Sequence, residues 1–453
     1  MLFLKKIFSP ASLSLSLFLL VYVFYKAEIY WDGAQVDFYK KYYNICFCLI
    51  IFSILSFFLN QNIKEIFIIT LISLVVGLYI SEVYFTFKKQ TEVEQSREYK
   101  ATNEQSLNKK KYKIYEKEGK KYDKRDRLQI FNDLKKINSK ITLAFHPSEN
   151  ISNKKKIFNL SGIADSETIY CNENGYYSIY KSDRYGFNNP NDEWDKKEIE
   201  YLLVGDSFTQ GACVNRPDDI ASVLRILSNK SALNLGMSGN GPLIEYAVLR
   251  EYLNPNVKKV IWLYYEGNDQ TDLLIEKKND ILKNYLNDLT FTQNLKFRQK
   301  EIDHQLNEFF DIELNKSQDK KNVTTKINYF LQFIKIYNLR SYISKTTTRK
   351  VLYQYEFKKI IELTNDLATK NNSKLYFVYL PEYDRYKNSY NNDSYINIKK
   401  IINELKIPFI DISRLVFEKE VDALKLFPFG EFGHYNEIGF KKVADTIYNL
   451  TKD

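Results

Sequence analysis

The stretch Tyr201-Leu-Leu-Val-Gly-Asp-Ser-Phe-Thr-Gln-Gly211 decides how the C-terminal half of this chain folds. Its four mostly aliphatic residues predict a short buried strand, and Gly205 marks the end of that strand. Asp206 and Ser207 follow where such a strand turns into a helix. A turn of this kind can hold a serine hydroxyl at the open edge of a sheet, beside backbone N–H groups that stabilise negative charge. Because Gly-Asp-Ser alone recurs by chance, its meaning depends on partners further along the chain.

Strand and helix patterns alternate from residue 200 to the C-terminus. The expected strands are 201–204, 232–235, 257–265, 374–380 and 408–412, and the expected helices are 220–227, 243–253, 396–405 and 438–450. This alternation predicts a parallel sheet covered by helices on both faces. Residues 270–350, rich in Lys and Asn, predict a mostly helical insertion. We interpret the insertion as a solvated helical excursion, and a lid over a site is the alternative.

Residues 1–90 have the composition of a membrane region. The runs Ile7–Tyr25, Tyr42–Leu59 and Ile66–Phe87 each match the thickness of a bilayer, and Glu82 is their one charged residue. No small-x-small cleavage site follows the first run, so we expect three retained transmembrane helices rather than a cleaved signal peptide. Residues 91–140 predict a charged helical linker. Residues 141–199 predict an irregular, β-rich segment, in which Asn172–Gly175 is a turn signal between two strand-like runs.

The net charge of +10 is concentrated next to the membrane region. Residues 88–140 hold 17 Lys and Arg against 9 Asp and Glu. This segment resembles a solvated linker and lacks the basic surface with stacking aromatics that nucleic acids require, so we expect no nucleic-acid partner. Lysines around the spans favour a cytoplasmic C-terminal region. Cys171 and Cys213, the only cysteines beyond the spans, could instead form a disulfide in an oxidising compartment or stay as two free thiols.

Three more clusters fall at or after the ends of expected strands, where open α/β sheets place their ligand sites. The first is Asn234-Leu-Gly-Met-Ser-Gly-Asn-Gly241, whose glycines expose backbone N–H groups. The second is Glu266-Gly-Asn-Asp269, in which the Asn268 amide can donate without carrying charge. The third is Glu431-Phe-Gly-His-Tyr-Asn-Glu-Ile-Gly439, directly before the last helix.

A serine nucleophile needs a base within hydrogen-bond reach, and a carboxylate usually orients that base. The chain has three histidines, and His434 is the one inside the α/β core. His146 precedes Pro147, and His304 lies in the charged insertion. Glu431, three residues before His434, is the carboxylate that we expect to orient the imidazole.

With these four clusters in order, residues 200–453 resemble the SGNH (GDSL-type) hydrolase family. The family's Ser, Gly, Asn and His match Ser207, Gly239, Asn268 and His434. The resemblance implies a flavodoxin-like, three-layer α/β/α domain with a parallel sheet, here preceded by transmembrane helices. It implies Ser207 as nucleophile, His434 as general base, and an oxyanion hole formed by the Ser207 and Gly239 N–H groups with the Asn268 amide. The family usually carries Asp where this chain has Glu431, and the extra methylene moves the carboxylate.

The resemblance implies a membrane-anchored serine esterase acting on acyl esters. The alternatives are an O-acyltransferase or deacetylase that modifies cell-envelope polysaccharide, and a catalytically inactive membrane scaffold. By analogy with envelope glycan-modifying proteins, we expect a multi-pass protein of the cytoplasmic membrane with an extracytoplasmic catalytic domain. The expected partners are the lipid bilayer and an acyl-ester substrate, with a glycan as one possible alcohol. No metal-ligand spacing, phosphate loop or dinucleotide fingerprint occurs, so no cofactor is expected.

Overall fold

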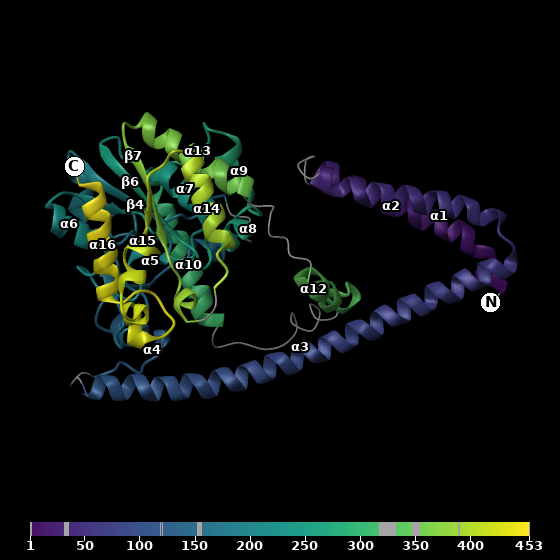
Figure 1. Ribbon diagram of the computed structural model, residues 1–453, viewed down its shortest axis with the longest axis horizontal. Coiled ribbons are helices and arrows are strands. Elements are labelled where there is room, and N and C mark those ends of the chain that lie inside the picture. The colour runs from purple at the N-terminus through teal and green to yellow at the C-terminus, as the bar shows by residue number, and fades with distance from the viewer. Residues whose placement is uncertain are drawn as a thin grey trace. The chain divides into compact units, whose positions relative to one another are not determined.

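The computed structural model describes residues 2–30, 36–117, 119, 121–151, 156–316, 332–346, 354–387 and 390–452 (Figure 1). Side chains 89–110 and parts of the predicted insertion, 317–331 and 347–353, lie outside the described residues. The contacts divide the chain into two units. The first comprises Met1–Thr102 and Lys321–Thr348, and the second comprises Asn103–Lys320 and Arg349–Asp453.

The first unit is built from long apolar helices. They are α1 (Leu2–Phe24) with its π-helical end η1 (Tyr25–Tyr30), α2 (Val36–Leu55) with η2 (Ser56–Phe58), and α3 (Gln61–Lys117). Within them, Phe3–Ile29, Tyr39–Phe58 and Gln61–Lys88 are long and apolar enough to cross a membrane. Serine hydroxyls join α1 to α2, with Ser12 Oγ 2.7 Å and Ser16 Oγ 3.0 Å from Ser53 Oγ. The three helices therefore suit the membrane association expected from the sequence.

Glu82, the one charged residue of the third apolar run, has polar partners inside the same unit. Its fully buried carboxylate accepts hydrogen bonds from the Asn338 and Leu339 N–H groups, at 2.9 and 2.8 Å. These groups belong to the first turn of α12 (Tyr337–Thr346) in the insertion. Carboxylates are costly in a bilayer unless they are paired. The start of α12 supplies that pairing, because the first N–H groups of a helix lack internal partners.

The second unit contains a five-stranded parallel sheet in the order β5-β4-β6-β7-β8. The strands are β4 (Ile199–Gly205), β5 (Ala232–Asn234), β6 (Val257–Tyr265), β7 (Lys374–Leu380) and β8 (Phe409–Asp411). Numbered along the chain this is the order 2-1-3-4-5 of flavodoxin-like sheets. β4 and the end of β6 are buried throughout, as expected for strands with both faces covered. The predicted fold class is confirmed.

Two helical layers cover this sheet. One core packs α7 (Pro242–Tyr252), α13 (Gln354–Lys370) and α14 (Asp393–Glu404) on one face, and a second core packs α6 (Ile220–Ser228) and α16 (Glu437–Thr451) on the other. Figure 1 shows α16 and α6 side by side. Among the described residues, the further helices are α4 (Arg127–Lys135), α5 (Ser207–Gln210), α8 (Asp269–Glu276), α9 (Asp280–Asn287), α10 (Gln299–Lys316) and α15 (Ile412–Leu415). Short 3₁₀ turns are Pro147–Asn150, Asn191–Asp195, Leu295–Phe297, Tyr383–Tyr386, Phe417–Lys419, Ala423–Leu426 and Pro428–Gly430.

Residues 141–199 add a small separate sheet of β1 (Ile141–Leu143), β2 (Glu167–Ile169) and β3 (Ile179–Lys181). β2 pairs parallel with β1 and antiparallel with β3. The strand-like runs on either side of Asn172–Gly175 therefore form a hairpin, and the predicted turn is its tip.

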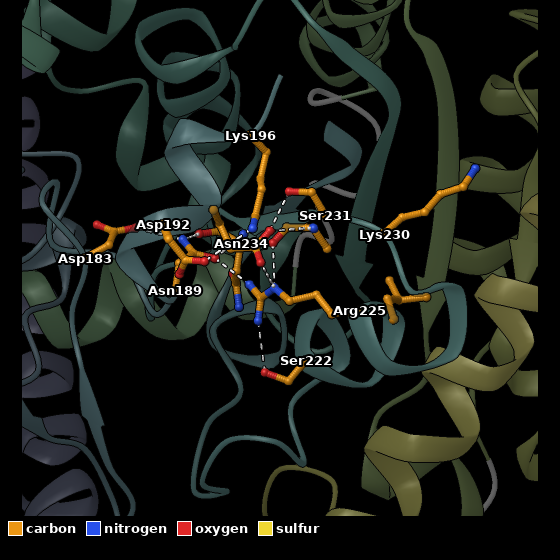
Figure 2. A network of polar contacts seen from close by, with 12 residues as sticks. Asp183, Asn189, Asp192, Lys196, Ser222, Arg225, Lys230, Ser231 and Asn234 are labelled. Atoms are coloured by element: carbon orange, nitrogen blue, oxygen red, sulfur yellow. Dashed lines mark hydrogen bonds and ion pairs between the residues drawn. The ribbon is translucent and has the colours of Figure 1, made fainter. Parts of the chain in front are cut away.

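A polar network fastens this segment to the edge of the main sheet (Figure 2). Asn189 Oδ1 accepts from the Asn234 N–H of β5 at 2.8 Å and from the Arg225 guanidinium at 2.9 Å. Its amide donates to the Asn234 carbonyl and to Asp183, at 2.9 and 2.8 Å. Because Asn189 and Asn234 are buried and satisfied, the network fixes the segment 183–195 against the sheet.

Candidate active site

Two of the predicted residues flank the point where the strand order reverses. The chain leaves β4 for β5 on one side and returns to β6 on the other, so a crevice opens beyond the carboxyl end of β4. Ser207 is the first residue of α5, directly after β4, and Asn268 is the N-cap of α8, just after β6. The topology alone therefore brings these two side chains to one edge of the sheet.

Asp206 caps the turn that carries Ser207. Its carboxylate accepts the Phe208 N–H at 2.9 Å, and Ser207 Oγ lies 3.4 Å from its second oxygen. Burial raises the pKa of Asp206 to about 6, although the Phe208 N–H opposes the shift. The Asp206 carboxylate therefore holds the turn that carries Ser207.

His434 is the base candidate, and its Nε2 lies 2.8 Å from Ser207 Oγ. The next two residues fix the loop that carries it. The Tyr435 hydroxyl donates to the Pro381 carbonyl at 2.6 Å, and the Asn436 side chain caps α16 by accepting the Gly439 N–H. The Phe208 ring packs against the imidazole with centroids 4.8 Å apart. The predicted serine and histidine therefore meet, although they are 227 residues apart.

The carboxylate on the other side of the imidazole comes from Glu173. Its Oε1 lies 3.0 Å from His434 Nδ1, and its Oε2 accepts the His434 backbone N–H at 2.6 Å. This corrects the expected position of Glu431, which is not the Nδ1 partner. The described geometry is thus a continuous chain from Ser207 through His434 to Glu173.

Gly433 explains why a distant residue occupies that position. A Cβ atom on Gly433 would lie 2.6 Å from Glu173 Oε2, so the missing side chain makes the space for the carboxylate. Glu431 precedes this gap with an extended backbone, at φ −121° and ψ 167°. The Nδ1 side of the ring is therefore filled by the hairpin tip and not by the histidine's own loop.

The charges around His434 favour its role as a base. Burial alone would lower the pKa of His434, but the Glu173 charge and hydrogen bond, helped by Asp206, raise it above its ordinary value. Burial would raise the pKa of Glu173, but the charge and hydrogen bonds of His434 outweigh it and lower the pKa. His146 differs, because burial and nearby positive charge lower its pKa to about 4. It is therefore neutral near pH 7.

The predicted oxyanion donors lie in different surroundings. The Asn268 amide donates one hydrogen bond to Asp272 at 2.6 Å, which leaves its second N–H for another acceptor. Gly239 has φ +75°, and a Cβ there would lie 2.5 Å from Ser148 Oγ and 3.7 Å from His146 Cβ. Glycine is thus required both for the backbone conformation and for the close approach of the 146–148 turn.

Ser207, His434, Glu173 and Asn268 line one cavity of about 280 Å³. Its walls also include the Phe208, Tyr265 and Phe432 rings and the Glu382 side chain. Gly239 is not among the described residues that line it. The Ser207 residue is 8% exposed, whereas the His434 and Glu173 side chains are 24% and 27% exposed. A small substrate can therefore reach the hydroxyl from solvent past the acid–base pair.

Cys171 and Cys213 form a disulfide in the structure, with Cα atoms 4.9 Å apart. The pairing that the sequence left open is therefore present. Among the described residues, Glu173, Cys213 and His434 are the one group whose donor atoms could hold a metal ion. The disulfide engages the Cys213 sulfur, so only two of these ligands are available.

Glu173 is the functional residue that the sequence did not reveal. It lies inside the turn signal Asn172–Gly175, which predicts a loop and no chemistry. The available signal was the spacing of the cysteines, because Cys171 precedes Glu173 by two residues and Cys213 follows Ser207 by six. A disulfide between them brings the two segments together.

No protein family model matches the chain, and no curated protein matches it in sequence. Similar solved structures include one described as a lipolytic protein of the G-D-S-L family from Desulfitobacterium hafniense DCB-2, with 14% identity, TM-score 0.31, and coverage of 56% of this chain and 99% of that chain. The acetyl xylan esterase AlAXEase has 14% identity, TM-score 0.30, and coverage of 56% and 99%. A mutant of Axe2, an acetyl-xylooligosaccharide esterase from Geobacillus Stearmophilus, has 12% identity, TM-score 0.30, and coverage of 56% and 94%. At such low identity and TM-score, we base the function on the site geometry.

Proposed function

We propose that this protein is a membrane-anchored serine hydrolase of the SGNH type that cleaves acyl esters through an acyl-Ser207 intermediate. One observation carries the proposal: Ser207 Oγ, His434 Nε2, His434 Nδ1 and Glu173 Oε1 form an unbroken hydrogen-bonded chain, with contacts of 2.8 and 3.0 Å. Nucleophile, base and orienting carboxylate in this arrangement activate a serine hydroxyl on unrelated folds.

The first half of the reaction acylates Ser207. His434 Nε2 takes the hydroxyl proton while Oγ attacks the ester carbonyl, and Glu173 stabilises the resulting imidazolium. The tetrahedral intermediate then collapses, and His434 gives the proton to the departing alcohol. In the second half, His434 takes a proton from water while the water oxygen attacks the acyl carbon. The second tetrahedral intermediate then collapses, His434 returns the proton to Ser207 Oγ, and the carboxylic acid leaves.

The negative oxygen of each tetrahedral intermediate needs donors already in place. We assign this role to the Ser207 and Gly239 N–H groups and to the free N–H of the Asn268 amide. Asn268 supports the assignment most directly, since it lines the cavity and Asp272 holds its orientation.

The second candidate function is acyl transfer to or removal from a polysaccharide of the cell envelope. It is favoured by Phe432, whose ring is 68% exposed at the cavity and packs edge-on against Tyr383. An exposed ring can stack against the apolar face of a sugar, while the Glu382 carboxylate at the same cavity can accept hydroxyl hydrogen bonds. Hydrolysis of p-nitrophenyl acetate with and without an oligosaccharide acceptor separates hydrolysis from transfer, because only transfer consumes the acceptor.

We further propose that the catalytic unit is extracytoplasmic and that the three apolar helices span the cytoplasmic membrane. The Cys171–Cys213 disulfide supports this, because such bonds persist in oxidising compartments. Single cysteines introduced at residues 100–120 provide the test. In intact cells an impermeant maleimide should label them, and labelling only after lysis would refute the orientation.

A fluorophosphonate probe tests the catalytic proposal. The full chain in detergent should be labelled, and Ser207→Ala should abolish the labelling while the protein stays folded by circular dichroism. Folded wild type that takes up no probe would refute the hydrolase and leave the inactive membrane scaffold.

A further inference from the structure

The acid of the proposed triad comes from outside the main sheet. Ser207 begins α5 directly after β4, and His434 lies in the loop before α16. Glu173 instead lies at the tip of the β2–β3 hairpin. Two backbone hydrogen bonds close this tip, from the Tyr170 N–H to the Ser178 carbonyl and from the Ser178 N–H to the Cys171 carbonyl, both at 2.9 Å, and Ser178 Oγ donates to the same Cys171 carbonyl at 3.3 Å. The position of its carboxylate therefore depends on what attaches the tip to the catalytic core.

Two of the attachments end at the same residue beside the nucleophile. The disulfide joins Cys171, two residues before Glu173, to Cys213. The Asn174 amide, one residue after Glu173, donates to the Cys213 carbonyl at 3.0 Å. Cys213 is fully buried and lies three residues after the end of α5, and the Ala212 N–H just before it donates to the Ser207 carbonyl at 3.0 Å. The nucleophile segment and the acid segment are thus covalently linked.

The sulfur also lies against the acid–base pair itself. Cys213 Sγ, a Glu173 carboxylate oxygen and a His434 ring nitrogen lie within 4.8 Å of one another. A shift of the hairpin tip large enough to separate the cysteines would therefore move the Glu173 carboxylate relative to His434. Misplacement by about 1 Å can cost roughly 100-fold in rate.

We propose that the Cys171–Cys213 disulfide positions Glu173 against His434, so that the reaction at Ser207 reaches its full rate only in the oxidised protein. The inference rests on the proposed function. A dithiol reductant supplies two electrons and two protons: the S–S bond breaks, two thiols form, and the reductant closes its own disulfide. The tip is then held by hydrogen bonds alone. Cys171 and Cys213 are positioning residues, because they act through Glu173.

The experiment compares oxidised and dithiothreitol-reduced protein in a background in which the free cysteines Cys46 and Cys48 are serine. The readouts are the rate of fluorophosphonate labelling and the pH profile of p-nitrophenyl acetate hydrolysis. EDTA is present throughout, because a freed Cys213 thiolate would complete a zinc-type ligand set with Glu173 and His434. The Cys171→Ser/Cys213→Ser variant is the matched control, since the reductant should leave its rate unchanged.

Reduction should lower kcat about 100-fold with a small change in KM, and should move the acidic limb of the pH profile to lower pH. The limb moves because the Glu173 charge and hydrogen bond raise the pKa of His434 more than the Asp206 charge does. In Glu173→Gln, reduction should have little further effect, since the two changes remove the same interaction. If the disulfide were purely structural, reduction would lower the rate of Glu173→Gln by the same factor by which it lowers the rate of wild type.

The outcomes separate the two proposals. An oxidised wild type that neither takes up the probe nor hydrolyses the ester refutes the proposed function, and this inference with it. An oxidised enzyme whose rate and acidic limb are unchanged by reduction refutes the positioning role and leaves the hydrolase intact. Additive losses in Glu173→Gln refute it as well, even where reduction also lowers the melting temperature.

Discussion

Glu173→Gln is the substitution that tests the reading of this site most directly. The change removes one charge and keeps the length of the side chain. The glutamine carbonyl can still accept the His434 backbone N–H, so its amide would donate to His434 Nδ1. An imidazole that accepts at Nδ1 carries its proton on Nε2, and it can no longer take the proton of Ser207.

The magnitude follows from the 3.0 Å contact between His434 Nδ1 and Glu173 Oε1. Opposite unit charges at that separation attract by about 5.5 kcal/mol at an effective dielectric constant of about 20. About a quarter of each side chain is exposed, which reduces the interaction. With about 1.4 kcal/mol for each factor of ten, we expect kcat to fall by roughly 10³- to 10⁴-fold.

The assay is p-nitrophenyl acetate hydrolysis from pH 5 to 9, with Glu431→Gln as the matched control. In wild type, activity should rise with pH as His434 loses its proton, with a midpoint above its ordinary pKa of 6.5. In Glu173→Gln, the residual activity should titrate at lower pH. Glu431→Gln should stay within about threefold of wild type. A large loss in Glu431→Gln, or a loss below tenfold in Glu173→Gln, would show that Glu173 is not the carboxylate that orients His434.

Three further substitutions test neighbouring features. Gly433→Ala places a methyl group 2.6 Å from Glu173 Oε2, so activity should drop at least tenfold with little change in melting temperature; unchanged activity would contradict the fit. His146→Gln should leave the acidic limb in place, because a group with a pKa of about 4 does not titrate there; a displaced limb would assign His146 a share in it. Glu82→Leu removes the acceptor of the half-buried Asn338 and Leu339 N–H groups at the start of α12, at about 1 kcal/mol each. An introduced Phe333→Cys, beside Tyr79, should then react faster with maleimide than it does with Glu82 present, and equal rates would refute the pairing.

The local patterns of the chain were sufficient for the main sheet. The predicted strands 257–265 and 374–380 coincide with β6 and β7, because both are rich in aliphatic and aromatic residues and are bounded by turn residues. The predicted last helix, 438–450, lies within α16. The sequence did not predict that the third apolar run and the start of the linker form one helix, α3. Within α3, Gly77 is the one residue that disfavours a helix, so no local signal separates the apolar run from the linker.

The candidate site divides between local and long-range information. Ser207, Asn268 and His434 were found because each sits at or beyond a strand end, and parallel strands bring their carboxyl ends to one edge. The acid could not be found in this way. Glu431 was chosen because it is close to His434 in sequence, whereas Glu173 is 261 residues away.

By itself, the sequence determined three membrane-like helices, a parallel α/β domain, and a serine and a histidine at its open edge. These properties depend on hydrophobic periodicity and on strand ends, which are local and can be read along the chain. The tertiary structure decided which carboxylate faces the histidine and that Cys171 pairs with Cys213. Both depend on where the β2–β3 hairpin lies relative to β4 and α5, and no local pattern encodes a distance between segments that only packing and a covalent link bring together.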